Sequence, residues 1–185
     1  VIVTGGGSGI GRAVCQRFAD EGAQVALFDI NTEGAAETVR TISQAGGGAR
    51  DYVTDIADYD AVEAAVAAVE ADIGPVEVLV NNAGWDEAMP FLATDTGLWR
   101  KIIDINLYGP LNLHHTVVSR MAQRQAGKVI NVASDAGRVG SSGEAVYSAC
   151  KGGIIAFSKT LARELARKNI QINTVCPGPT DTPLF

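Results

Sequence analysis

The stretch VIVTGGGSGIG at residues 1–11 decides the fold of this chain. A short apolar run ends at Thr4, a glycine-rich segment follows, and a helical pattern begins near Gly9. Such a turn lets the backbone approach a pyrophosphate, whose negative charge the helix N-terminus favours. Gly5, Gly9 and Gly11 have the spacing G-x-x-x-G-x-G rather than the commoner G-x-G-x-x-G. By itself the motif predicts either a nucleotide-binding loop or a glycine-rich connector.

Apolar runs rich in β-branched residues alternate with helical patterns along the rest of the chain. Most of these runs are continuous, as expected of strands that are covered on both faces. The predicted strands are 1–4, 24–29, 49–54, 76–81, 128–133 and 171–175, and the predicted helices are 9–21, 32–46, 59–73, 95–125 and 144–168. This alternation indicates right-handed crossovers and a parallel sheet. We therefore predict one α/β domain over residues 1–185, a doubly wound parallel sheet.

Asp29 ends the second predicted strand, eighteen residues after Gly11. At that position a carboxylate can accept hydrogen bonds from the hydroxyls of an adenosine ribose. A phosphate on the ribose would be repelled by Asp29, and neither Gly7 nor Ser8 supplies a positive charge to receive it. Arg12 is interpreted as a surface or packing residue. The sequence therefore predicts NAD rather than NADP.

Two further strand ends are predicted to line the same crevice. Asp55 and Ile56 close the third strand, where a polar side chain could reach the edge of an adenine. Asn81, Asn82, Ala83 and Gly84 close the fourth strand. In a doubly wound sheet, the carboxyl ends of the strands line the ligand crevice. An ordinary turn is the alternative for the second segment, because Asn and Gly are turn residues.

Tyr147 and Lys151 stand four residues apart in the last predicted helix, so their side chains project from the same face. We expect a fixed ammonium beside the phenol to lower the pKa of Tyr147 toward neutrality. Such a tyrosine can give a proton to a carbonyl oxygen or take one from an alcohol. Ser134 precedes Tyr147 by thirteen residues, and Asn106 lies in an earlier polar break. Alone, the Y-x-x-x-K pattern more often marks an exposed surface pair.

In their order and spacing, these motifs resemble those of the short-chain dehydrogenase/reductase family. Its members are single-domain Rossmann enzymes with a three-layer αβα fold. The resemblance covers the whole chain and rests on T-G-x-x-x-G-x-G, Asp29, Asp55, N-N-A-G, Asn106, Ser134, Y-x-x-x-K and Pro177-Gly178. It implies an oxidoreductase that moves a hydride between a nicotinamide and a secondary alcohol or ketone. Tyr147 would be the general acid/base, and Lys151 would lower its pKa and hold the nicotinamide ribose.

The resemblance also implies roles for the remaining site residues. Ser134 would hydrogen-bond the substrate oxygen, and Asn106 would distort its helix and hold a water that links Lys151 to solvent. Pro177 and Gly178 would contact the nicotinamide. The implied cofactor-binding residues are Gly5, Ser8, Gly9, Ile10, Gly11, Asp29, Asp55, Ile56, Asn82, Ala83, Gly84, Tyr147, Lys151, Pro177, Gly178 and Thr180.

The segments around Trp85, Ser134, Tyr147 and Cys176 are similar to those of dehydrogenases that oxidise 2-hydroxycyclohexanecarboxyl-CoA with NAD. The expected substrate is therefore this acyl-CoA thioester or a similar 3-hydroxyacyl-CoA. A 3-oxoacyl-acyl-carrier-protein reductase and a dehydrogenase of polyols or other secondary alcohols are the alternatives. A dinucleotide sensor without catalysis is a third alternative, because fold does not fix function.

Composition argues against several other partners. The formal net charge of −6 argues against nucleic acid and acidic membranes, and no apolar run reaches the ~18 residues of a membrane span. Cys15, Cys150 and Cys176 have no metal-like spacing, which is typical of a reduced, cytoplasmic protein. His114-His115 lacks neighbouring ligands, so we predict packing or surface roles and no metal.

The two ends of the sequence predict a C-terminally truncated fragment of a longer protein. The chain begins within an apolar run and stops after a loop rich in Pro, Gly and Thr. By resemblance, a substrate-covering segment and a last strand would follow, and their absence would leave residues 171–175 as an apolar edge. The resemblance also implies a homotetramer or homodimer for the full-length protein.

Overall fold

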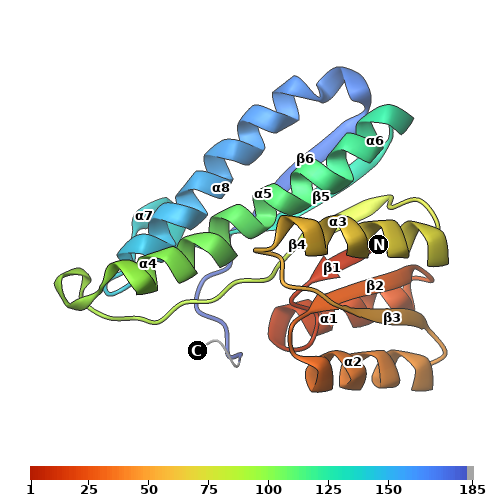
Figure 1. The fold of residues 1–185 in the computed structure, drawn as a ribbon, viewed down its shortest axis with the longest axis horizontal. Coiled ribbons are helices and arrows are strands. Elements are labelled where there is room, and N and C mark those ends of the chain that lie inside the picture. The colour runs from red at the N-terminus through yellow and green to blue at the C-terminus, as the bar shows by residue number, and fades with distance from the viewer. Residues whose placement is uncertain (183–185) are drawn as a thin grey trace.

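A six-stranded parallel sheet forms the centre of the computed structural model, which describes residues 1–182 (Figure 1). The strand order is β3-β2-β1-β4-β5-β6, and every neighbouring pair is parallel. The strands are β1 (Ile2–Thr4), β2 (Gln24–Asp29), β3 (Gly48–Val53), β4 (Val78–Asn81), β5 (Gly127–Val132) and β6 (Ile170–Val175). The chain moves outward from β1 to β3 and then returns to β4, which confirms the predicted doubly wound α/β fold.

Helices cover both faces of the sheet. They are α1 (Gly9–Asp20), α2 (Thr32–Gln44), α3 (Tyr59–Asp72), α4 (Thr96–Ile103), α5 (Gly109–Leu113), α6 (Ser119–Arg124), α7 (Ala136–Val139) and α8 (Ala145–Glu164). In Figure 1, α1 and α2 lie on one side of the first three strands and α3 on the other, and α5, α6 and α8 run along β5 and β6. The chain therefore has three layers, helix–sheet–helix.

The alternation of side chains along the strands builds two separate hydrophobic cores. Ile2 and Leu79 face the layer of α3, α5 and α6, where they pack with residues of those helices. Val3 and Val80 are their chain neighbours and face α1 and α2. All four are essentially inaccessible to solvent, and burying a side chain of this size stabilises the fold by about 1.5–3 kcal/mol. Packing on both faces holds the carboxyl ends of β1 and β4 at the switch point.

The long predicted helix at 95–125 is an almost unbroken helical run in which two segments widen. Residues 104–108 and 114–118 form π-helical turns between α4, α5 and α6. The last predicted helix ends at Glu164, and a 3-10 turn, Ala166–Lys168, leads to Asn169. Asn169 has a positive φ of 54°, which stops the helix before β6 begins.

The two edge strands depart from the prediction of continuous buried runs. β3 has no buried residue, because it pairs only with β2 and its sequence carries charged residues. β6 pairs only with β5 within the described residues, and its last residue, Val175, is 52% exposed. Over residues 1–182, no helix is both long enough and apolar enough to cross a membrane.

Candidate active site

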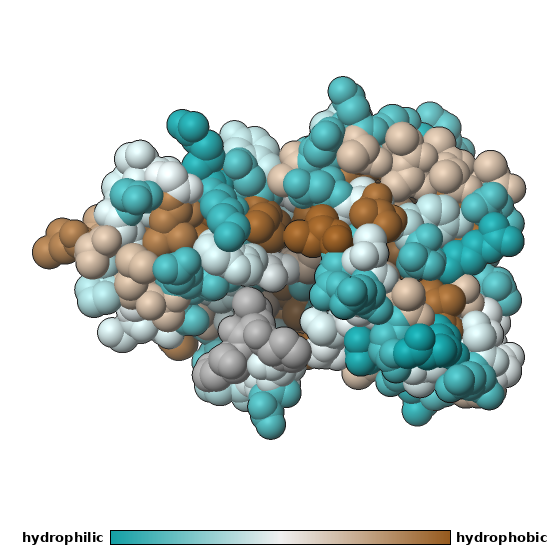
Figure 2. Space-filling model, turned by 60° about the horizontal axis from the view of Figure 1, so that its bottom comes forward, coloured by the Kyte–Doolittle hydropathy of each residue, from teal (hydrophilic) through white to brown (hydrophobic). Residues whose placement is uncertain are grey.

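A cavity of about 1100 Å³ opens at the carboxyl ends of the strands. Figure 2 shows apolar side chains along the middle of this face of the molecule, with hydrophilic side chains on either side. The cavity brings together most of the residues predicted from the sequence: Gly5, Ser8, Gly9, Ile10, Asp29, Asp55, Ile56, Asn82, Ala83, Gly84, Ser134, Tyr147, Lys151, Pro177, Gly178 and Thr180. Gly11 and Asn106 do not line it, and both lie just behind its wall.

The glycine-rich loop wraps closely around the start of α1. Gly5 has a φ of +66°, a conformation that other residues rarely adopt. A Cβ atom at Gly11 would lie 2.0 Å from the carbonyl oxygen of Gly5. Gly11 therefore lets the helix pack against the loop, and the loop in turn exposes Gly9 at the N-terminus of α1 to the cavity. This arrangement suits a pyrophosphate.

Hydrogen bonds from Thr4 join this loop to the end of β4. Its hydroxyl accepts the backbone N–H groups of Asn82 and Ala83, each at 3.0 Å. The Asn82 amide donates to the carbonyls of Thr4 and Gly5, at 3.0 and 3.3 Å. Asn82 thus holds the two strand ends together beside the cavity. No role was predicted for Thr4, although its place at the end of β1 indicated a crevice residue.

Asp29 is held in one orientation by backbone donors. Its Oδ2 accepts the N–H of Gly7 and its Oδ1 that of Asn31, both at 2.8 Å. Each carboxylate oxygen keeps a further lone pair for a ribose hydroxyl. Arg12 donates to the carbonyls of Gly7 and Gly34, at 2.5 and 3.3 Å, which confirms its packing role. The glycine-rich loop and the start of α1 therefore fit the pyrophosphate of a dinucleotide, and Asp29 fits its adenosine ribose.

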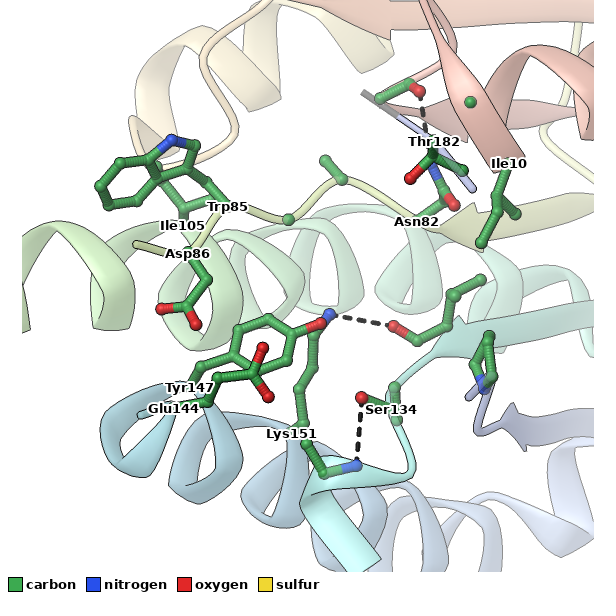
Figure 3. Close-up of a pocket in the computed structure, with 18 of the residues that line it drawn as sticks. Ile10, Asn82, Trp85, Asp86, Ile105, Ser134, Glu144, Tyr147, Lys151 and Thr182 are labelled. Carbon is green, nitrogen blue, oxygen red and sulfur yellow. Dashed lines mark hydrogen bonds between the residues drawn. The ribbon is translucent and has the colours of Figure 1, made fainter. Parts of the chain in front are cut away.

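Ser134, Tyr147 and Lys151 meet at the other end of the cavity. Ser134 follows β5, whereas Tyr147 and Lys151 come from successive turns of α8. Figure 3 shows the three side chains turned into the same part of the pocket. The Lys151 Nζ atom lies 5.4 Å from the centre of the Tyr147 ring and donates to the carbonyl of Val132 at 3.1 Å. A hydrogen-bonded serine, a phenol and an ammonium can together bind a carbonyl oxygen and protonate it.

The predicted lowering of the Tyr147 pKa is wrong for this structure. Burial raises the pKa of Tyr147, hydrogen bonding with Ser134 opposes that rise, and the charges of Glu144 and Asp86 add to it. Burial also lowers the pKa of Lys151 to about 8. The ammonium is directed to a backbone carbonyl, so its effect on the phenol is smaller than helix spacing alone suggested. Tyr147 is consequently protonated at neutral pH.

Asn106 lies in the first π-helical turn and is fully buried. Its amide donates to the carbonyls of Trp85 and Ile102, at 2.6 and 2.9 Å, and its Oδ1 accepts the N–H of Trp85 at 3.3 Å. A Cβ atom at Gly84 would lie 2.9 Å from the Asn106 Oδ1 and 3.4 Å from the Lys151 Nζ. Asn106 therefore adjoins Lys151 through Gly84 and connects a widened helix to the loop after β4. The water that the resemblance assigns to Asn106 stays a prediction.

The cavity is also lined by residues that were not predicted from the sequence. Thr54 and Val132 lie at or beside the ends of β3 and β5 and line it, as does Ile30 after β2. The rule that strand ends face the ligand could have found all three. Asp86 and Lys101 also line it, and the Lys101 ammonium lies 3.4 Å from the centre of the Trp85 ring. No sequence pattern pointed to these two.

The two adjacent histidines have the packing and surface roles expected of them. His114 is buried, its Nδ1 lies 2.6 Å from the carbonyl of Pro110, and its ring meets Phe157 edge-on. Burial lowers the pKa of His114 to about 4, so its ring is neutral. His115 bonds the exposed hydroxyl of Tyr59 at 2.8 Å. The described part of the chain contains no group of three or more residues suited to a metal ion.

Comparisons with known proteins agree with this geometry. The family model of the short chain dehydrogenases matches residues 1–185. Acetoacetyl-CoA reductase of Shinella zoogloeoides is 38% identical over 183 residues, which cover 99% of this chain and 74% of that protein. The 3-oxoacyl-acyl-carrier-protein reductase of Thermotoga maritima is 37% identical over 183 residues, with the same coverage. A crystal structure of an actinorhodin polyketide ketoreductase with NADPH has a TM-score of 0.96 at 37% identity, covering 99% of this chain and 71% of that one.

The fold and the site define a dinucleotide-dependent oxidoreductase. The chain belongs to the short-chain dehydrogenase/reductase family. The two named relatives are reductases of oxoacyl thioesters, and neither is named for oxidation of a cyclic hydroxyacyl-CoA. The predicted family is therefore confirmed, and the finer resemblance to dehydrogenases of 2-hydroxycyclohexanecarboxyl-CoA is not what these relatives favour.

Proposed function

We propose that this chain interconverts 3-oxoacyl and 3-hydroxyacyl thioesters with a nicotinamide dinucleotide. The observation that carries the proposal is the meeting of Ser134, Tyr147 and Lys151 in the cavity that also holds the glycine-rich loop. Relatives named as reductases of acetoacetyl-CoA and of 3-oxoacyl-acyl-carrier-protein support the thioester substrate.

The proposed roles follow from the side chains. Ser134 binds the substrate oxygen, and Tyr147 donates a proton to that oxygen during reduction. Because the pKa of Tyr147 is raised, the phenol carries its proton at neutral pH and is ready to donate it. Lys151 is mostly charged below its pKa of about 8, so its ammonium can hold the ribose hydroxyls beside the phenol. The nicotinamide, when bound, supplies the hydride.

NAD is the proposed cofactor, and Asp29 supports this choice. A ribose phosphate would approach a carboxylate already fixed by two backbone donors. A Cβ atom at Gly7 would lie 2.8 Å from the Asp29 Oδ2, so a basic side chain at that position would displace the carboxylate. The polyketide ketoreductase with NADPH is the opposing observation. Values of kcat/KM for NADH and NADPH decide between the two cofactors, and equal values would refute the choice of NAD.

The substrate can be tested with three reactions followed by nicotinamide absorbance. We expect reduction of acetoacetyl-CoA, with slower or no oxidation of a sugar alcohol. The second candidate substrate, 2-hydroxycyclohexanecarboxyl-CoA, is also a 3-hydroxyacyl thioester, and the resemblance around Trp85 and Tyr147 is its support. Turnover of the polyol without turnover of either thioester would contradict the proposed function.

We also propose a homotetramer or homodimer in the cytoplasm. The family resemblance supports the oligomer, and the free thiols of Cys15, Cys150 and Cys176 support a reducing compartment. Light scattering measures the oligomeric state directly, and a monomer would refute that part of the proposal.

A further inference from the structure

Two carboxylates lie beside the reacting end of the cavity without an evident role. Asp86 belongs to the loop after β4, and Glu144 precedes α8. Both line the cavity, and Figure 3 shows both carboxylates close to Tyr147. The backbone N–H of Met89 donates to the carbonyl of Gly143 at 2.9 Å, which joins the two segments. The acids are therefore held together at this place by the backbone.

The environment of Asp86 is unfavourable for a carboxylate. Its Oδ2 is buried and has no hydrogen-bond partner among the described residues. Burial raises the pKa of Asp86, a bond from the Glu87 backbone opposes that rise, and the charge of Glu144 increases it. The same two charges raise the pKa of Tyr147. Asp86 and Glu144 therefore act electrostatically at the reacting hydroxyl itself.

No cation neutralises this pair within residues 1–182. None of the salt bridges of the described chain involves Asp86 or Glu144. Lys101, a cation that lines the cavity, is held over the Trp85 ring, and Figure 3 shows that ring turned away from Tyr147. Beside Tyr147, these two unpaired carboxylates therefore outnumber the one ammonium of the reacting end, that of Lys151.

We propose that Asp86 and Glu144 make the site reject substrates that carry a carboxylate next to the reacting carbonyl. This inference rests on the proposed function and names the form of its substrate, a neutral acyl thioester rather than the free 3-oxo acid. In both forms the reacting carbon is two bonds from the second carbonyl group. The free acid places a negative charge there, beside the two carboxylates, and the thioester does not.

The size of the effect follows from Coulomb's law. Two like charges about 6 Å apart at a protein surface repel strongly enough to change an affinity roughly a hundredfold. Solvent screens half-exposed groups, so we expect a change of about tenfold for each carboxylate that is removed.

The test compares two ketones of equal acyl length that differ in charge. Acetoacetate carries a carboxylate, and its N-acetylcysteamine thioester is neutral and has no phosphate groups. For each variant, kcat/KM for acetoacetate is divided by kcat/KM for the thioester, so loss of folded enzyme cancels. Asp86→Asn and Glu144→Gln are expected to raise this ratio about tenfold. Glu164→Gln removes an exposed charge at the far end of α8, outside the cavity lining, and should leave the ratio unchanged.

The outcomes separate the two proposals. Wild-type protein that reduces the thioester supports the proposed function, and one that reduces neither ketone refutes both proposals. Ratios that stay within about twofold of wild type in both Asp86→Asn and Glu144→Gln would overturn charge selection alone. So would wild-type protein that reduces acetoacetate as efficiently as the thioester.

Discussion

Replacing Lys151 by methionine should abolish turnover and yet stabilise the fold at pH 7. Burial lowers the pKa of Lys151 from 10.5 to about 8, and this difference corresponds to about 3 kcal/mol. It measures the cost of keeping the ammonium charged inside the protein. Methionine has a similar length and no charge. Loss of the hydrogen bond to the Val132 carbonyl offsets about 1 kcal/mol of the gain, which leaves a net stabilisation of about 2 kcal/mol.

The stability gained by Lys151→Met has a defined pH dependence. Because the pKa of Lys151 is lower in the folded protein, the unfolded chain binds more protons between pH about 8 and 10.5. The stability of the wild-type protein therefore rises through this range relative to the methionine variant. The advantage of Lys151→Met should be largest at pH 7, where lysine is charged in both states, and should disappear by pH 10.5.

Denaturant unfolding followed by circular dichroism at pH 7 and pH 10 measures both effects. Lys159→Met is the matched control, because Lys159 is exposed on the same helix. Its free energy of unfolding should stay within about 0.5 kcal/mol of wild type at both pH values. A Lys151→Met variant that is less stable than wild type at pH 7 would refute the reasoning. An advantage of equal size at pH 10 would contradict it as well.

Three further variants test the site. Tyr147→Phe should lower turnover about 100- to 10,000-fold while NADH binding, measured by fluorescence, is kept, and retained turnover would contradict the acid/base role. Gly11→Ala places a Cβ atom 2.0 Å from the Gly5 carbonyl oxygen, which must move the loop. Calorimetry should therefore show NADH binding weakened by at least about tenfold. An unchanged affinity would show that the loop can move without loss of binding. Asp29→Ser should reduce the preference for NADH over NADPH by about tenfold or more, given the loss of a charge beside the ribose, and an unchanged ratio of kcat/KM values would remove Asp29 as its cause.

Local patterns in the sequence were sufficient for the order of the elements and for most of the cavity wall. The β-branched runs and the glycine spacing predicted β1, the loop and α1, because these features depend on neighbouring residues. The rule that parallel strands present their carboxyl ends at one edge then brought Asp29, Asp55 and Asn82 together. Tyr147 and Lys151 share a helix face for the same local reason.

Electrostatic environment and contacts between distant segments were decided by the tertiary structure alone. Helix spacing indicated a phenol with a lowered pKa, but burial and the charges of Asp86 and Glu144 raise it. Asp86 approaches Tyr147 only because a loop without regular structure is joined to the start of α8. Desolvation depends on every atom packed around a group, and these atoms come from elements far apart in the chain. A sequence pattern reflects neighbours along the chain, so it predicts neither the desolvation of a group nor its contacts with distant segments.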